Sequence, residues 1–267
     1  MPGPIRTDGP PRLPGLKGPT VARVVSLAAV FVLWEACARP QSRLIAAPLS
    51  EVVVALFGLL GRTEFRDAYW ETIKPFSVGL ALAIGIGVPT GLLLGLSGRL
   101  RAVIVPYVNL VNAVPMVAFI PLVVIALGIG LEARVAVVFL FAISDIVLTS
   151  ASGVRYVNAD LIDMGRSFGA SRALSFARIV LPGSLPGVMA GVRLGTGRAV
   201  IGMVASELLL VSVGIGALIS RYRGYYETAN LYAAVMVLAL TGIVLLELVR
   251  RFELRVLHWQ RAGERNR

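Results

Sequence analysis

The chain has 267 residues, of which 57% are hydrophobic and 15% are charged, and its formal net charge is +11. Soluble domains contain about 45–50% apolar and about 25% charged residues, so this composition excludes an ordinary soluble domain. The single cysteine, Cys37, and the single histidine, His258, exclude an intrachain disulfide, a thiolate metal centre and a histidine-based catalytic site. In a membrane protein the positive charge fits loops that face the cytoplasm, so no nucleic-acid partner is expected.

The first residues differ in composition from the rest of the chain. Residues 1–19 are rich in proline and glycine and have no periodicity, which predicts a disordered cytoplasmic tail. The first apolar segment, 20–38, follows directly. Its Ala36–Ala38 triplet resembles a signal-peptidase site, so a cleaved signal peptide is the alternative to a retained span, although the basic leader is long for one.

Apolar segments recur along the rest of the chain. The polar stretch 39–74 contains an apolar island, 49–61, that is too short to cross a bilayer and predicts an interfacial or extramembrane helix. Five further segments are each long enough to cross a hydrocarbon core of about 30 Å. They cover residues 76–97, 102–127, 135–151, 185–211 and 229–249. The predicted fold is an all-α polytopic membrane protein with about six transmembrane helices.

The distribution of basic residues orients these spans. With six spans, both termini lie on one side together with the long loop 152–184. Lys and Arg are about twice as numerous on that side as on the other, where Arg134 is counted among the loop residues. We therefore expect both termini and this loop in the cytoplasm, with a transmembrane domain at 20–259 and a basic cytoplasmic tail at 260–267.

The long loop has helical periodicity in two pieces. Apolar side chains form one face of each piece, and they are Leu161, Met164, Gly165 and Phe168 in the first and Ala173, Phe176, Ala177 and Val180 in the second. Gly169 is predicted to end the first helix, Ser171 to cap the second and Pro182 to stop it. Periodicity alone also allows a helix pair that lies passively on the lipid head groups.

The segment from Asp163 to Pro182 resembles the EAA motif of permease subunits in bacterial ABC importers. Asp163 holds the acidic position, Gly169 follows six residues later, Ile179 comes after nine intervening residues, and Leu181–Pro182 close the motif. Two departures are visible, because aspartate replaces glutamate and Met164–Gly165 replace two alanines. The segments 112–130, 191–209 and 213–219 are similar to the nitrate/sulfonate/taurine branch of this family, and the resemblance covers about residues 48–259.

This resemblance implies a type I ABC importer permease-like fold in the bacterial cytoplasmic (inner) membrane. It implies that the chain itself has no ATPase site or cofactor, since a partner ATP-binding cassette subunit would bind ATP and Mg. The sequence agrees with this, because it has no G-x-x-x-x-G-K-[ST] phosphate-binding loop. The other implied partners are a second permease copy and an extracytoplasmic solute-binding protein. The implied solute is small and is expected to be an anion, such as a sulfonate, taurine or nitrate. The residues implied to couple to the ATP-binding subunit are Asp163, Met164, Gly165, Phe168, Gly169, Ala170, Ser171, Arg172, Ile179, Leu181 and Pro182.

Ionisable residues within the predicted spans are candidates for the pathway, since charges inside a bilayer are costly. They are Asp145, Arg193, Arg198 and Glu207. Arg193 lies near the cytoplasmic end, where it can snorkel. Arg198 lies deeper and needs a partner, either Asp145 or a backbone carbonyl. Glu207, toward the external end, has a pathway role or forms a structural pair with a neighbouring basic residue.

The third predicted span carries polar and helix-breaking residues. Asn112, Pro115 and Pro121 interrupt its apolar sequence, which is tolerated where the freed backbone groups line a cavity. We hypothesise that the third and fifth spans line the pathway, and helix packing is the alternative. An ion-gradient-driven secondary transporter or a channel is the alternative function, although no inverted repeat is visible and intramembrane carboxylates are sparse.

Overall fold

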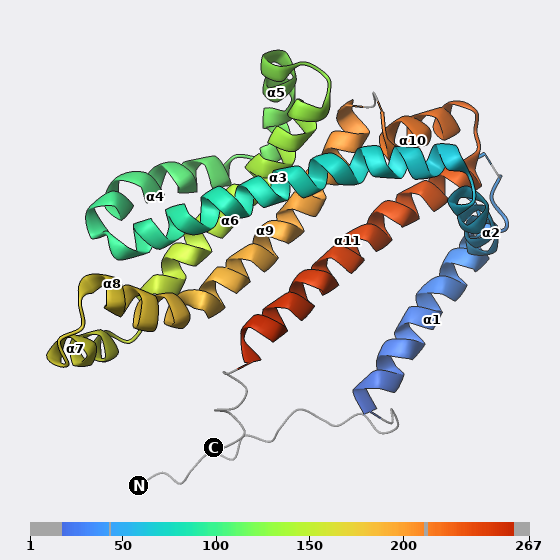
Figure 1. The fold of residues 1–267 in the computed structure, drawn as a ribbon. Helices are drawn as coiled ribbons and strands as arrows, with labels where there is room; N and C mark the ends of the chain where they lie inside the picture. The colour runs from blue at the N-terminus through green and yellow to red at the C-terminus, as the bar shows by residue number, and fades with distance from the viewer. Residues whose placement is uncertain (1–17, 43, 211–212, 259–267) are drawn as a thin grey trace, which may run out of the picture.

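The computed structural model describes residues 18–42, 44–210 and 213–258, and the regular elements within these residues are all helices (Figure 1). The basic tail expected at 260–267, and the expected N-terminal tail up to residue 17, lie outside the described residues. Five helical segments are long and apolar enough to cross a membrane, or six if one bent pair counts as a span. The expected number of about six spans is therefore confirmed with this bent pair included.

The spanning segments run between two ends of the molecule. Four of them are α1 (Gly18–Ala38), α3 (Thr63–Leu96), α6 (Leu131–Arg155) and α11 (Thr228–Val256). The fifth consists of α8 (Arg172–Ser175), a π-helical turn η2 (Phe176–Val180) and α9 (Leu181–Leu210). In Figure 1 the start of α1, the end of α11 and the short helix α7 (Ala159–Ser167) lie at the same end of the molecule. This arrangement agrees with the orientation expected from the basic residues.

Small residues hold the centre of the bundle together. On α3, Gly79, Gly87, Gly91 and Gly95 face α6, and on α9, Gly187, Gly191, Gly195 and Gly202 face α6 from the other side. A Cβ atom at Gly187 would lie only 2.3 Å from the Cα of Gly153, so the two backbones touch there. Such small-residue stripes allow close helix packing in a bilayer, where burial of apolar side chains gives little driving force between helices.

The third span differs from its prediction as one kinked helix over 102–127. Helix α4 (Gly98–Ala113) is followed by a 3-10 turn, η1 (Met116–Phe119), and helix α5 (Ile120–Leu127), and the two parts are bent by 91°. Pro115 causes the break, because proline disfavours helical geometry in the residue before it, and Val114 is extended at φ −81° and ψ 136°. Pro121 does not break a helix but lies in the first turn of α5, where its missing N–H is harmless.

The second span is longer than expected at its external end. Helix α3 begins at Thr63 and continues through the buried Pro75, so the last third of the polar stretch 39–74 is helical. Its 34 residues extend about 51 Å at 1.5 Å per residue, more than the bilayer core requires. The apolar island forms the separate helix α2 (Leu49–Leu60), as predicted. At the same end, helix α10 (Ile215–Gly224) connects α9 to α11.

Candidate functional site

The cytoplasmic loop turns at Gly169. This residue has a positive φ of 78°, as predicted for the residue after a helix C-terminus. Its N–H donates to the carbonyl of Arg166 at 2.8 Å, and the Ala170 N–H donates to the carbonyl of Gly165 at 3.0 Å. These two bonds form a Schellman motif. The predicted N-cap is confirmed as well, since Ser171 Oγ accepts a hydrogen bond from the Leu174 N–H at 3.3 Å.

The glycine that departs from the EAA motif has a structural reason. A Cβ atom on Gly165 would lie 2.7 Å from Cδ1 of Ile179, so the absence of a side chain lets Ile179 pack directly against α7. The two positions belong to the same motif. The first loop helix is therefore held by the segment that follows the turn.

The expectation that Pro182 stops the second loop helix is wrong. Helices α8, η2 and α9 are continuous, and the Leu181 N–H donates to the Phe176 carbonyl in an i→i+5 bond. A regular α-helix would place the proline ring against a carbonyl of the preceding turn. The π-helical turn shifts this hydrogen-bond pattern just before Pro182, so the helix continues into the membrane span.

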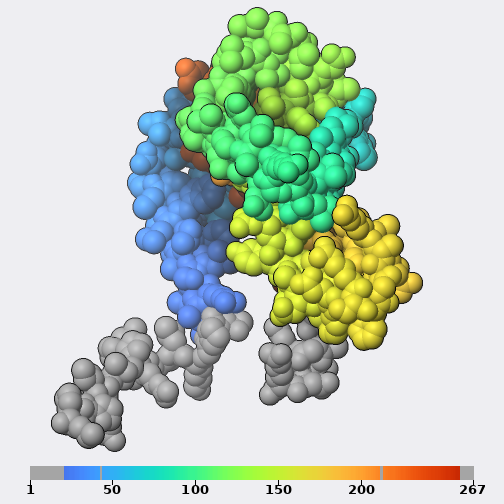
Figure 2. Space-filling model, turned by 90° about the vertical axis from the view of Figure 1, so that its left-hand side faces the viewer, coloured from blue at the N-terminus to red at the C-terminus, as the bar shows by residue number. Residues whose placement is uncertain are grey.

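One side of the loop is an exposed apolar surface. The side chains of Leu161 and Met164 are 49% and 51% exposed, and that of Phe168 is 86% exposed. They border a groove of about 530 Å³ that Gly165, Arg178, Ile179, Pro182 and Gly183 complete. In Figure 2 the loop, in yellow, projects from one end of the molecule. We call this surface the outer groove, and it contains five of the eleven expected coupling residues, which are Met164, Gly165, Phe168, Ile179 and Pro182.

The remaining expected coupling residues lie elsewhere on the loop. Ala170 and Arg172 line a different cavity, on the side of the loop that faces the ends of α3 and α6. Asp163 is solvent-exposed and forms an ion pair with Arg166, with Nη1 3.2 Å from Oδ1. The structure thus divides the motif residues between two faces.

The candidate pathway residues form separate ion pairs. Arg198 Nε lies 3.2 Å from Asp145 Oδ2, which confirms Asp145 as its partner. The Arg198 side chain is 49% exposed in the single chain. An exposed charge midway along a span requires water or protein beside it rather than lipid. Ala205, seven residues further along the same face of α9, packs against a cluster in which Met116 of η1 and Ile120 of α5 meet residues of α6. The bent third span therefore belongs to a cluster that lies on the external side of this pair.

Arg193 and Glu207, the other two ionisable candidates, each pair with a different residue. Arg193 Nη1 lies 2.9 Å from Glu253 Oε2 on α11, a partner that the sequence analysis did not identify. Of the third-span candidates, Asn112 is half-buried near the end of α4, and Pro115 and Pro121 are exposed in the single chain.

Glu207 belongs to a buried cluster at the external end. Its Oε1 lies 3.3 Å from Nη1 of Arg134, and the two side chains are 1% and 3% exposed. Its Oε2 accepts a hydrogen bond from the Gly216 N–H at 2.7 Å, and Thr72 Oγ1 accepts one from the Ile215 N–H at 3.0 Å. Glu207 therefore holds the first turn of α10 and forms the structural pair that the sequence allowed.

Arg134 is the residue that sequence reasoning missed, because it was counted as an external loop residue. It also donates from Nη1 to the carbonyl of Glu71 at 2.9 Å, so it connects α6 to both α3 and α9. Among the described residues its Nε has no hydrogen-bond partner. Arg134 lies four residues after Gly130, in the first turn of α6. This position was the available signal for its burial, because neighbouring elements can bury the residues at the end of a helix.

The surface next to this cluster is charged and exposed. Arg221 on α10 pairs with Glu64 in the first turn of α3. The hydrogen bond that Arg221 donates to the Glu64 carboxylate raises the pKa of Arg221. This pair ties α10 to α3 a second time, on the outside of the cluster.

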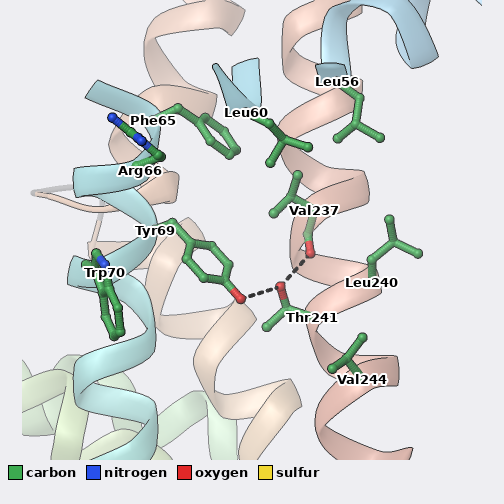
Figure 3. A pocket seen from close by; sticks show the side chains of 10 residues that line it. All are labelled: Leu56, Leu60, Phe65, Arg66, Tyr69, Trp70, Val237, Leu240, Thr241 and Val244. Atoms are coloured by element: carbon green, nitrogen blue, oxygen red, sulfur yellow. Dashed lines mark hydrogen bonds between the residues drawn. The ribbon is translucent and has the colours of Figure 1, made fainter. Parts of the chain in front are cut away.

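A third groove has a different character. It lies between α2, α3 and α11, and its lining is almost entirely apolar (Figure 3). Within it the Thr241 hydroxyl donates to the Val237 carbonyl at 2.8 Å and lies 3.3 Å from the Tyr69 hydroxyl. Among the described residues that line it, only Arg66 carries a charge. No group of three or more His, Cys, Asp or Glu side chains suited to a metal ion occurs in the part of the chain that the structure describes.

These features define a class of protein, a multi-pass helical membrane transport subunit with a projecting cytoplasmic loop. Residues 87–258 match the family described as "Binding-protein-dependent transport system inner membrane component". The chain belongs to this family, and it is the permease component of an ABC importer in the inner membrane. Family membership favours this function over the gradient-driven alternative.

Similar proteins agree with the expected branch. The chain is 29% identical to "Taurine transport system permease protein TauC" of Escherichia coli (strain K12) over 88% of both chains. It is 26% identical to "Putative aliphatic sulfonates transport permease protein SsuC" of Bacillus subtilis (strain 168), over 89% of this chain and 87% of that one. A solved structure of the MetNI methionine ABC transporter, in inward-facing conformations, matches with a TM-score of 0.60 at 21% identity over 72% of this chain and 96% of that chain. This last match concerns the fold.

Proposed function

We propose that this permease works as a pair of identical copies, is driven by separate ATP-binding subunits and imports a small anion that an extracytoplasmic solute-binding protein delivers. ATP and Mg would be bound by the partner subunits. The observation that carries the proposal is the outer groove. It presents exposed Met164 and Phe168 on a loop that the Schellman turn and the contact between Gly165 and Ile179 hold in place.

The loop is suited to transmit a movement. Its second half continues without interruption from α8 through η2 into α9, so a force applied at Phe168 reaches the span that carries Arg198. Closure of two ATP-binding subunits would then move α9 as part of a rigid body, which is a known form of switching between two states.

The pair of Arg198 and Asp145 supports an anionic solute. Its guanidinium is half-exposed within a span, and among the residues that the structure describes only the Asp145 carboxylate neutralises it. The relatives named for taurine and for aliphatic sulfonates concern solutes with a sulfonate group. A guanidinium binds such groups through two parallel hydrogen bonds. We infer that the surface around Arg198 lines the pathway, between the loop and the external cluster of Arg134 and Glu207.

Co-purification tests the coupling surface. A tagged permease is co-expressed with its ATP-binding subunit, and we expect capture to be lost in Phe168→Asp and Gly169→Arg while insertion into the membrane persists. Tyr156→Ala is the matched control, because Tyr156 is 89% exposed at the beginning of the loop but does not line the outer groove. Normal capture and uptake by both loop variants would contradict the proposal.

Removing both charges of the Arg198–Asp145 pair tests whether Arg198 binds the solute in the pathway. Arg198→Ala leaves Asp145 unpaired, whereas Arg198→Gln with Asp145→Asn removes both charges. If the guanidinium binds the solute, uptake stays defective in the double variant although the complex assembles. Restored uptake in the double variant would show instead that the pair only serves helix packing.

A further inference from the structure

A cavity separates the cytoplasmic loop from the body of the protein, and we call it the inner cavity. It measures about 420 Å³ and is bounded on one side by α7, α8 and η2 and on the other by the ends of α3 and α6. Its apolar lining includes Leu96 at the end of α3 and Val154 in the last turn of α6, with Phe176 from η2. None of its lining residues belongs to the outer groove.

Two guanidinium groups line the inner cavity, and its lining residues include no carboxylate. Arg166 is paired with Asp163, but both side chains are exposed, at 66% and 70%, and such pairs are weak. Arg172 has no ion-pair partner in the described part of the chain. The cavity therefore combines a positive rim with an apolar interior.

Ser175 is an independent indication of a missing acceptor. The residue is 6% exposed and lines the same cavity, and its Oγ has no hydrogen-bond partner among the described residues. Buried hydroxyl groups normally have a partner, because an unpaired one loses its hydrogen bond to water on burial. A ligand oxygen would supply this bond.

We propose that the inner cavity binds the head group of an anionic phospholipid from the cytoplasmic leaflet. A phosphate satisfies both guanidinium groups and the Ser175 hydroxyl, since arginine binds phosphate through bidentate hydrogen bonds. The apolar lining favours a lipid over a free anion, because Leu96, itself 51% exposed, lies where α3 leaves the membrane. Basic pockets between membrane helices on the cytoplasmic side recognise head groups in this way.

The bound lipid would connect the loop to the transmembrane body. Between α7 and the ends of α3 and α6 it would take the place of protein contacts, so the position of the outer groove would depend on anionic lipid. The proposal concerns the permease alone. Its test needs no ATP-binding subunit, and its outcome is independent of the proposed coupling and solute.

Lipid competition on the full-length permease tests the site. The protein is placed in nanodiscs that contain equal amounts of phosphatidylglycerol and phosphatidylcholine with the same acyl chains, and retained lipids are counted by native mass spectrometry after release. We expect retention of phosphatidylglycerol over phosphatidylcholine, and a loss of ~5-fold in this preference for each of Arg166→Gln and Arg172→Gln. Arg178→Gln is the matched control, because Arg178 lies on the same loop but lines the outer groove.

Hydrogen exchange separates a lipid from a free anion. We expect phosphatidylglycerol to slow exchange across residues 159–175 in the wild type, and inorganic phosphate added to lipid-free protein to have no such effect. Equal protection by phosphate alone would overturn the lipid as ligand. An unchanged lipid preference in the doubly neutralised variant, or the same loss in Arg178→Gln, would overturn the site. Both arginines are exposed, so their neutralisation leaves the packing of the loop intact.

Discussion

Replacing Arg134 by methionine should destabilise the external end of the protein. The substitution keeps a long apolar side chain but removes the guanidinium that pairs with Glu207 and donates to the Glu71 carbonyl. Glu207 then remains buried with the Gly216 N–H as its donor and no cation beside it. The first turn of α10, which Glu207 holds, should loosen as a consequence.

The expected magnitude follows from the burial of both partners. With side chains 3% and 1% exposed, the pair belongs to the buried class, for which removal of one partner costs about 3–5 kcal/mol. In a chain of this size about 1 kcal/mol lowers the melting temperature by about 2–4 °C, so a fall of about 10 °C is expected. Arg134→Met combined with Glu207→Gln should recover at least half of this loss, because the only carboxylate left without Arg134, that of Glu71, is exposed, and a carbonyl oxygen still accepts from the Gly216 N–H.

Thermal denaturation of the purified permease in detergent measures these changes by light scattering. Arg251→Met is the control, because Arg251 forms an exposed ion pair with Glu247 on α11, and exposed pairs contribute about 0–1 kcal/mol. Its melting temperature should stay close to that of the wild type. If Arg134→Met melts within about 2 °C of the wild type, or if the double variant melts below the single one, the buried pair does not stabilise this end as argued.

Three glycine substitutions should have graded effects. Gly165→Ala should preserve uptake, because the new Cβ atom contacts Cδ1 of Ile179, which ends a flexible side chain and can shift. Loss of uptake in this variant would contradict that expectation. Gly187→Ala should lower the melting temperature by several degrees, because its Cβ would lie 2.3 Å from the Gly153 backbone. An unchanged melting curve would show that α6 and α9 can move apart. Gly169→Ala should destabilise the turn by about 1 kcal/mol, because alanine is strained at the positive φ of Gly169. Hydrogen exchange around the turn should then accelerate ~5-fold. Unchanged exchange would mean that opening of the Schellman turn does not limit exchange there.

The local features of the cytoplasmic loop could be predicted from the sequence because neighbours in the chain determine them. The positive φ of Gly169 and the N-cap of Ser171 each depend on hydrogen bonds that span only a few residues. The wrong expectation in this region concerned Pro182. A proline rule assumes α-helical hydrogen bonding, and the π-helical turn before Pro182 changes that bonding.

The sequence predicted the partner of one arginine within the spans but not the partner of the other. Asp145 was a candidate partner for Arg198 because the spans contain few carboxylates, and the structure selected it. Glu253 was missed as the partner of Arg193, since it lies 60 residues further along the chain and outside the predicted spans.

By itself the sequence determined a helical membrane protein, its orientation and the turn of its cytoplasmic loop, because hydropathy, charge and capping act over short distances along the chain. Only the tertiary structure decided that Arg134, 73 residues before Glu207, is buried against it, and that the loop has an outer groove and an inner cavity on different faces. The physical reason is that burial depends on which helices meet. Here glycine stripes on α3 and α9 bring their backbones onto α6, and they thereby fix which polar side chains become neighbours.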